Sequence, residues 1–405
     1  MHCPLCQNKN SQKELFKISN VFTSSSKLDQ NLTQIQTLND YNKYSTKRYC
    51  RDDNTITLTQ CQNCGYIYNS SFDLDKISKE YQSKGYFSRK IVSKSMGNNI
   101  KIIKDKCLKY IDKSSTCLEV APGSGDMVNA LAHEVKFIYT IDPSLVSLEI
   151  ENVNNLKHIQ GFFNYDIVKN KLEHKIDFII FRHLLEHINT PLDFLKNIVK
   201  ILENNGIIYI EVPNIEEFIK HGRFYEIFND HCGYYQKNVL INILQTLGCE
   251  FIDEIFLYRE QHMGLFFKKN INTLNINKLK FELFDENISS SFEKNIKKIN
   301  SFLSNYLNIA IYGSGAHGNS IVTFIDNPEK IKKCFDLDTR KQGMYLQNSS
   351  IIIQEPNVDN FKDVEAIIIA APLYEEEIIK FLGEKGYKGD IIATEKEIKM
   401  IKNHT

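Results

Sequence analysis

Two C-x-x-C pairs, Cys3 with Cys6 and Cys61 with Cys64, have spacing that is typical of metal ligands. Each pair places two sulfurs on one tight turn, and four thiolates can close a tetrahedron around zinc. A redox pair is expected between a strand and a helix, and a catalytic zinc would keep one ligand position open. The spacing favours a structural zinc site formed by all four cysteines.

A glycine-containing turn follows the apolar strand in TCLEVAPGSGDMVNALA and precedes a pattern of helical spacing. Gly123 and Gly125 allow the backbone there to approach a ligand closely. The next strand, in FIYTIDPS, ends at Asp142, whose carboxylate can accept both hydroxyls of a ribose. Turn and acid together predict a site for an adenosine-like group. Glu119 either lies near that ligand or simply ends the strand.

The segment His183-Leu-Leu-Glu186-His187 matches the H-x-x-E-H arrangement of one group of zinc proteases. The segment follows the buried strand IDFIIF, at the position where α/β sheets bind their ligands. No distant third zinc ligand is evident in the sequence. We therefore interpret the motif as a ligand-binding loop and first helical turn.

The composition restricts the kind of partner. The 405 residues carry 50 basic and 50 acidic side chains without a sustained basic block, which argues against nucleic acid or an anionic membrane. No apolar run approaches the ~20 residues that span a bilayer, and the first residues lack a signal-peptide core. We expect a cytoplasmic protein with a small-molecule partner. The oligomeric state is left open, a monomer included.

Length and patterning predict three domains of α/β class. Residues 1–85 would form a small zinc-binding domain, and 86–265 a central domain in which strands and helices alternate as in a class I methyltransferase. Residues 266–405 would form a Rossmann-like α/β domain. Its segment NIAIYGSGAHGNSIVTFI places glycines in a strand-to-helix turn, and a second strand ends near Asp336. Taken alone, this pattern predicts NAD binding.

The order of these blocks resembles the sugar C-methyltransferases over nearly the whole chain. The resemblance rests on CPLC, CQNCG, LEVAPGSGD with IDPS, HLLEHI, EVPN, FNDHCGYY and IYGSGAHGN. It implies a zinc-binding domain, a central S-adenosylmethionine domain, and a C-terminal Rossmann-like domain that helps to enclose a nucleotide-linked 4-keto-deoxysugar. The C-terminal domain would then have no redox role.

The same resemblance implies residue roles. His231 matches the family's base, next to Asp230, and His187 matches a second active-site histidine. The expected cofactor-binding residues are Glu119, Ala121, Pro122, Gly123, Gly125, Asp142, Pro143 and His183. The expected substrate-binding residues are Tyr86, Asn214, Phe228, Asn229, Gly313, Gly315 and His317.

The implied chemistry is removal of the acidic C3 hydrogen beside the 4-keto group by the neutral imidazole of His231, followed by methylation of the enolate. Asp230 would orient His231 or stabilise its protonated form, and His187 would stabilise the enolate oxygen. Two positions depart from the family pattern, with Phe228 in place of Tyr and Asp230 in place of Glu. The alternatives are O-methylation of a sugar hydroxyl, a noncatalytic sugar-nucleotide-binding protein, and a packed, hydrogen-bonded role for His231.

Overall fold

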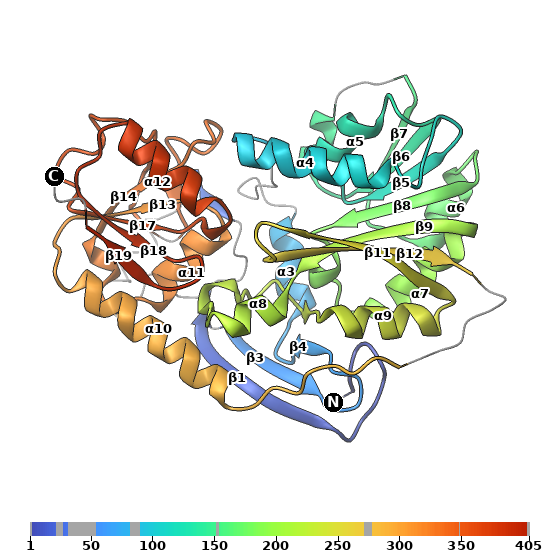
Figure 1. Cartoon of the computed structure of the whole chain (residues 1–405), viewed down its shortest axis with the longest axis horizontal. Helices are drawn as coiled ribbons and strands as arrows, with labels where there is room; N and C mark the ends of the chain where they lie inside the picture. The colour runs from blue at the N-terminus through green and yellow to red at the C-terminus, as the bar shows by residue number, and fades with distance from the viewer. Residues whose placement is uncertain are drawn as a thin grey trace.

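The computed structural model describes the following parts of the chain: residues 2–21, 27–30, 54–81, 90–150, 154–270, 278–347 and 349–402. Three domains can be followed in Figure 1, with the N-terminal sheet in blue, the central domain from cyan to yellow and the C-terminal domain in orange and red. No helix in these ranges is long and apolar enough to cross a membrane.

The central domain contains a seven-stranded sheet of order β11-β12-β9-β8-β5-β6-β7. The strands are β5 (Thr116–Val120), β6 (Phe137–Asp142), β7 (Leu156–Gln160), β8 (Ile176–Arg182), β9 (Leu202–Pro213), β11 (Cys249–Leu257) and β12 (His262–Lys269). All neighbours are parallel except β12, which runs antiparallel to both β9 and β11. This order, with one reversed strand inserted near one edge, is the class I methyltransferase fold, so the predicted fold class is confirmed.

Helices cover both faces of the central sheet, so its inner strands are buried on both sides. They are α4 (Lys94–Cys107), α5 (Asp126–Leu131), α6 (Tyr165–Lys171), α7 (Pro191–Ile201) and α9 (Lys237–Thr246), with the short α8 (Ile215–Lys220) after β9. Strand β7 was not predicted, since it is a polar edge strand in which Ile159 alone is buried. Strand β12 continues past the expected domain boundary at 265.

The N-terminal domain is a four-stranded antiparallel sheet of order β1-β3-β4-β10. Its strands are β1 (Gln12–Val21), β3 (Asn54–Cys61), β4 (Ile67–Asn69) and β10 (Gly233–Tyr234), and helix α3 (Leu74–Tyr81) follows β4. Strand β10 comes from the central part of the sequence and begins two residues after His231. Its pairing with β4 joins Gly233 to Tyr68 and Tyr234 to Ile67.

The C-terminal domain has a six-stranded sheet of order β16-β14-β13-β17-β18-β19, parallel except for β19. Its elements are α10 (Asn287–Leu303), β13 (Ile309–Tyr312), α11 (Ala316–Phe324), β14 (Ile331–Phe335), β16 (Ile353–Gln354), β17 (Ala366–Ile369), α12 (Glu375–Glu384), β18 (Asp390–Ala393) and β19 (Lys399–Ile401). The expected Rossmann-like pattern is present. A short pair of strands, β2 (Leu28–Asp29) and β15 (Tyr345–Leu346), joins the N-terminal and C-terminal domains.

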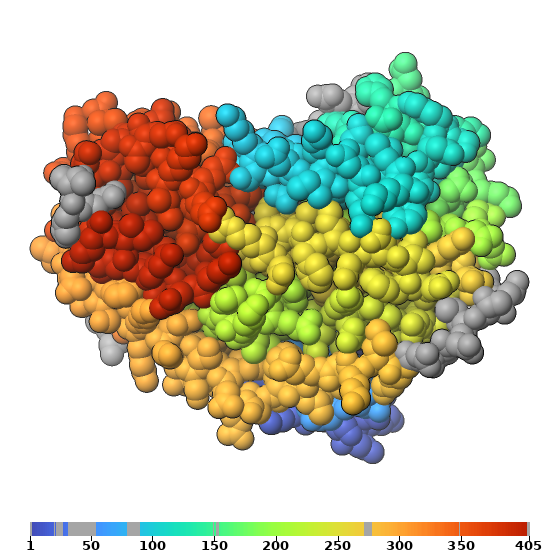
Figure 2. All heavy atoms as spheres, in the orientation of Figure 1, coloured from blue at the N-terminus to red at the C-terminus, as the bar shows by residue number. Residues whose placement is uncertain are grey.

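The C-terminal domain packs directly on the central domain. Figure 2 shows its red surface against the cyan start of α4 and the yellow β11–β12 region. Ser93, at the start of α4, donates a hydrogen bond to Glu377, and Arg259, between β11 and β12, forms ion pairs with Glu376 and Glu395. These contacts hold the surfaces on either side of the candidate site together.

Candidate active site

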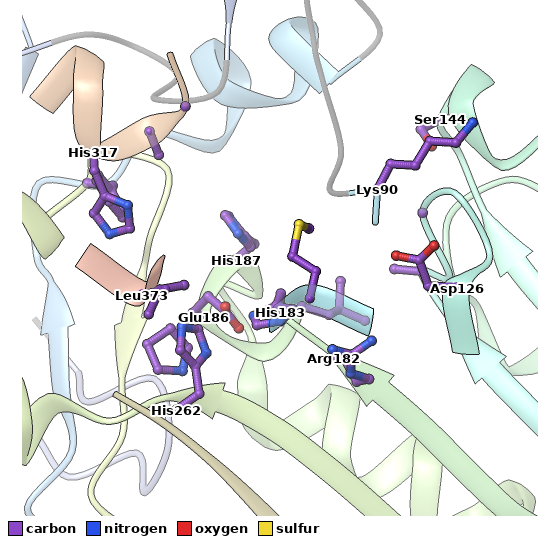
Figure 3. Close-up of a pocket in the computed structure, with 18 of the residues that line it drawn as sticks. Lys90, Asp126, Ser144, Arg182, His183, Glu186, His187, His262, His317 and Leu373 are labelled. Atoms are coloured by element: carbon purple, nitrogen blue, oxygen red, sulfur yellow. The ribbon is translucent and has the colours of Figure 1, made fainter. Parts of the chain in front are cut away.

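A cavity of about 870 Å³ lies where the three domains meet. Helix α3 of the N-terminal domain lines it, together with the loops at the carboxyl ends of β5, β6 and β8 and the glycine turn of the C-terminal domain. In Figure 3, Asp126 and Ser144 lie on one side, His317 lies on the opposite side, and His183, His187 and His262 lie between them. The cavity therefore has an acidic end and a histidine-rich end.

The glycine turn after β5 forms the acidic end. Ala121 and Gly123 both have φ of 56°, a left-handed conformation that brings their backbone groups toward the cavity. Asp142 Oδ2 accepts a hydrogen bond from the Gly123 amide at 3.2 Å, and Oδ1 accepts one from the Ser144 amide at 2.7 Å. The predicted pairing of turn and acid is therefore present, with Asp142 fixing both loops.

Glu119 lies at the end of β5, only 4% exposed, and lines the same part of the cavity. Burial raises the pKa of its carboxyl to about 8, although the nearby Arg182 opposes this rise. Asp126 and Asp142 line this end as well. Such a concentration of carboxyl groups suits a ligand with positive charge.

A buried ion-pair network supports the floor between the two ends. Glu211 accepts hydrogen bonds from Arg182 at 2.7 and 3.2 Å and from Tyr209 at 2.9 Å, and its Oε1 lies 2.9 Å from His183 Nε2. Burial alone would raise the pKa of Glu211, but Arg182 and His183 hold it well below its usual range. This network fixes His183, whose φ is 51°, at the end of β8.

His187 and His231 form the centre of the histidine-rich end, with ring centroids 4.7 Å apart at an interplanar angle of 87°. His187 Nδ1 lies 2.8 Å from the backbone carbonyl of Asp230, so this nitrogen donates the proton and Nε2 keeps a lone pair. Asp230 thus contacts His187 through its main chain. His231 Nδ1 is buried and has no hydrogen-bond partner among the described residues.

The environment keeps His231 neutral. Burial lowers its pKa well below the usual value, and repulsion from His187, His317 and His183 lowers it further. The imidazole therefore has a lone pair available for a proton at neutral pH. His183 and His187 have separate partners, Glu211 and the Asp230 carbonyl, so the described contacts do not assemble the two ends of the H-x-x-E-H motif around one ion.

Four of the described residues that were predicted for the site are not part of the cavity lining. Asn214 caps α8, since its side chain accepts from the Glu216 amide, and it also donates to the Glu260 carbonyl. Gly125 is the N-cap of α5, with φ of 81°. Asn229 and Asp230 are buried beside the cavity. Tyr86 lies outside the described residues. The other predicted residues of the cofactor and substrate sets line the cavity: Glu119, Ala121, Pro122, Gly123, Asp142, Pro143, His183, Phe228, Gly313, Gly315 and His317.

The C-terminal domain contributes its own glycine turn. Gly318 lies against the Gly313 carbonyl so closely that a Cβ would stand 2.2 Å from that oxygen. Asp336 accepts hydrogen bonds from the Ser314 amide and hydroxyl at 3.0 and 2.5 Å. Its Oδ2 also lies 3.4 Å from Lys341 Nζ. The Asp336 carboxylate therefore closes this turn, as Asp142 does in the central domain.

Sequence reasoning missed Glu226, in the short 3-10 helix Phe224–Glu226 before the Asp230–His231 pair. Its Oε2 lies 2.8 Å from His317 Nε2, across the boundary between the central and C-terminal domains. The acidic residue close before FNDHCGYY was the only local signal. Its partner is 91 residues away, so the pairing could not be predicted from spacing.

The four predicted cysteines come together beside the N-terminal sheet. The sulfurs of Cys3 and Cys64 are 3.7 Å apart, as are those of Cys6 and Cys61, and all four lie within 4.8 Å of one another. A tetrahedral zinc with ~2.3 Å bonds has sulfur–sulfur edges of about 3.8 Å, which this arrangement fits. The hydrogen bond between the two thiols raises the pKa of Cys3 to about 12 and lowers that of Cys6, and a cation among the four sulfurs would favour their thiolate forms.

The methyltransferase domain family matches residues 96–254, and the family described as C-methyltransferase C-terminal domain matches residues 268–392. The chain therefore contains a methyltransferase domain followed by a C-methyltransferase C-terminal domain. The C-methyltransferase NovU of Streptomyces niveus is 23% identical over 157 residues, which are 37% of this chain and 36% of NovU. The match thus spans about a third of that relative.

Solved methyltransferase structures resemble only part of this chain. An S-adenosylmethionine-dependent methyltransferase from Clostridium acetobutylicum has 12% identity and a TM-score of 0.35, covering 44% of this chain and 93% of its own. One from Archaeoglobus fulgidus has 15% identity and a TM-score of 0.35, covering 43% and 94%. The fold assignment rests on the strand order and the matched domain families.

Proposed function

We propose that this methyltransferase uses S-adenosylmethionine to methylate C3 of a nucleotide-linked 4-keto-deoxysugar, with His231 as the base. The observation that carries the proposal is the neutral imidazole of His231 in a cavity that also holds the central glycine turn and the C-terminal one. This cavity is large enough for a sizeable ligand, and each of its ends has a distinct chemistry.

The acidic end is the proposed cofactor site. Its left-handed turn at Ala121 and Gly123 would let a ligand approach the backbone, and Asp142 would accept ribose hydroxyls alongside the Gly123 amide. Glu119 offers a buried carboxyl for an ammonium group. When bound, S-adenosylmethionine supplies an electrophilic methyl group on a positively charged sulfur, which the acidic surroundings favour.

At the histidine-rich end, His231 would remove the C3 proton. The 4-keto group makes that proton acidic, and the negative charge moves to the keto oxygen as the proton leaves. His187 would hold that oxygen as an imidazolium that has taken its Nε2 proton from solvent, because its Nδ1 proton is committed to the Asp230 carbonyl. The carbanion character left at C3 is the nucleophile that carbon methylation requires.

The cysteine cluster is the proposed structural zinc site. Its four sulfurs would all be ligands, which leaves no open position for substrate. The zinc would fix the turn between β3 and β4, and β4 pairs with β10 directly after His231. In this proposal the metal shapes the active site without entering the chemistry.

Deuterium exchange tests the proposed reaction. The methyltransferase is incubated in heavy water with a panel of nucleotide-linked 4-keto-deoxysugars, with and without S-adenosylmethionine, and the substrate mass is followed. We expect deuterium uptake at C3 and, with cofactor, a methyl group that NMR places on carbon. A methyl group on oxygen would replace the proposal with O-methylation, and a panel bound without any methylation would indicate a binding protein.

Cofactor binding is also expected to release protons. Because the pKa of Glu119 is about 8 in the protein alone, its carboxyl is mostly protonated at pH 7 and must ionise to engage a cation. Calorimetry of S-adenosylmethionine binding at pH 7, in buffers of different ionisation enthalpy, should report release of up to about one proton. Glu119→Gln should abolish this release. Equal release by both proteins would remove Glu119 from the cofactor site.

A further inference from the structure

The two carboxylate oxygens of Glu226 have different surroundings. Oε2 is paired with Nε2 of His317 at 2.8 Å. Oε1 is fully shielded and has no hydrogen-bond partner among the described residues, in a side chain that is only 4% exposed. A buried acceptor without a donor is costly, because it has lost its water and gained nothing in return. Oε1 therefore calls for a donor that a ligand brings.

Glu226 lies on the side of the cavity that holds the base. Glu226, Phe228, His231 and His317 all line the cavity. The Phe228 ring lies between the two histidines, with its centroid 4.8 Å from His231 and 5.5 Å from His317. Figure 3 shows His317 across the cavity from Asp126. The Glu226–His317 pair thus faces the substrate end rather than the cofactor end.

The chemistry of the pair restricts what it can bind. His317 Nε2 is already paired with Oε2 of Glu226, and the Phe228 ring has no hydrogen-bond donor. Oε1 cannot accept from phosphate or keto oxygens, which have no hydrogen to donate. A sugar hydroxyl can donate, and a hydrogen bond to an ionised acceptor in a buried site is stronger than a neutral one.

We propose that Glu226 binds a ring hydroxyl of the sugar through Oε1 and that His317 is the positioning residue that holds its carboxylate in place. This assignment rests on the proposed function and specifies it further, since the substrate must carry a hydroxyl near the reacting carbon. A site built to receive a hydroxyl rejects the analogue that lacks it, by up to about 10⁴–10⁵-fold in favourable cases.

Three probes test this proposal: thymidine diphosphate-4-keto-6-deoxyglucose and its 2-deoxy and 3-deoxy analogues. The measured quantity is the ratio of kcat/KM between the parent sugar and each analogue, which is independent of the fraction of folded enzyme. For the 3-deoxy analogue, whose C3 carries no hydroxyl, the methylated product is identified by NMR. We expect the wild type to favour the parent over one analogue by at least about 10²-fold.

Glu226→Leu should bring the ratio of kcat/KM between the parent sugar and the disfavoured analogue to within a few-fold of one. His317→Asn should lower the same ratio by raising the KM for the parent sugar, with little change in kcat. The matched control is Glu217→Leu, which removes another buried glutamate paired with a histidine, at 3.1 Å from His221, outside the cavity lining. It should preserve the wild-type ratio. An unchanged ratio in Glu226→Leu, or a wild type that treats all three probes alike, would overturn the assignment of Glu226.

S-adenosylmethionine binding is also measured by calorimetry on the wild type and on each variant. This measurement distinguishes failure of the proposed substrate class from failure of the assignment of Glu226. A wild type that binds S-adenosylmethionine but neither binds nor methylates any of the three probes refutes the proposed substrate class, and the assignment of Glu226 with it. A wild type that methylates the probes without discriminating between them refutes the assignment alone.

Discussion

Replacing His231 with asparagine is expected to lower kcat for methyl transfer by about 10²–10⁴-fold, the range that a positioned general base contributes. Asparagine keeps a polar group at the site but cannot take the C3 proton. The affinity for S-adenosylmethionine should stay within a few-fold, because the cofactor end is built from the loops after β5 and β6. Single-turnover kinetics and calorimetry measure the two effects separately.

The matched control is His221→Asn, which removes an imidazole that pairs with Glu217 outside the cavity lining. It should retain wild-type kcat. Retention of kcat within a few-fold by His231→Asn would assign the base to another residue, with His187 the next to test.

The acid limb of the pH profile gives an independent check on the same residue. Burial and the neighbouring histidines hold the pKa of His231 well below 6.5, so the neutral form persists as the pH falls through 6.5. With S-adenosylmethionine saturating, the kcat/KM for the sugar should therefore decline only below pH 6.5. An acid limb above pH 6.5 that disappears in His231→Asn would contradict the environment described here.

The second large effect is expected from loss of the proposed zinc at the cysteine cluster. Cys64→Ser, or chelation of the metal, should lower kcat by about 10²-fold, the loss expected for a displacement of about 1 Å at a reacting group. The physical path is short: Cys61 and Cys64 flank the turn into β4, and β4 pairs with β10 two residues after His231. The Asn69 amide also donates to the Cys232 carbonyl at 3.1 Å.

Metal content by mass spectrometry, kcat and cofactor affinity are measured on the same samples. Cofactor affinity should change little, since the N-terminal sheet does not contain the central glycine turn. Cys334→Ser, a buried thiol in the C-terminal domain outside the cluster, is the control and should keep both metal and kcat. Full kcat after complete removal of the metal would show that the β4–β10 pairing holds without it.

The features that the sequence predicted well are those with local signals. The turn at Gly123, the acid at Asp142 and the alternation of buried strands with helices each depend on residues close together in the chain, and all are present. The strand β7 was missed because only Ile159 in it is buried, so its sequence does not show the apolar pattern that predicts a strand. Asn214, expected to contact substrate, caps α8 through the Glu216 amide and donates to the distant Glu260 carbonyl.

Long-range contacts explain the remaining differences. Asp230 was expected to orient His231 or stabilise its protonated form, and the structure adds a contact from its backbone carbonyl to His187, 43 residues away in the sequence. The recruitment of residues 233–234 into the N-terminal sheet, and the bond between Glu226 and His317, join segments far apart in sequence. No periodicity or spacing along the chain reports which distant segments will become neighbours.

The bond between Glu226 and His317 also limits how such an enzyme can be recombined. A chimera that receives its C-terminal domain from a relative without a histidine at position 317 would leave Glu226 buried with neither oxygen compensated. The two positions must therefore be inherited or engineered together, although they belong to modules that otherwise fold around separate sheets.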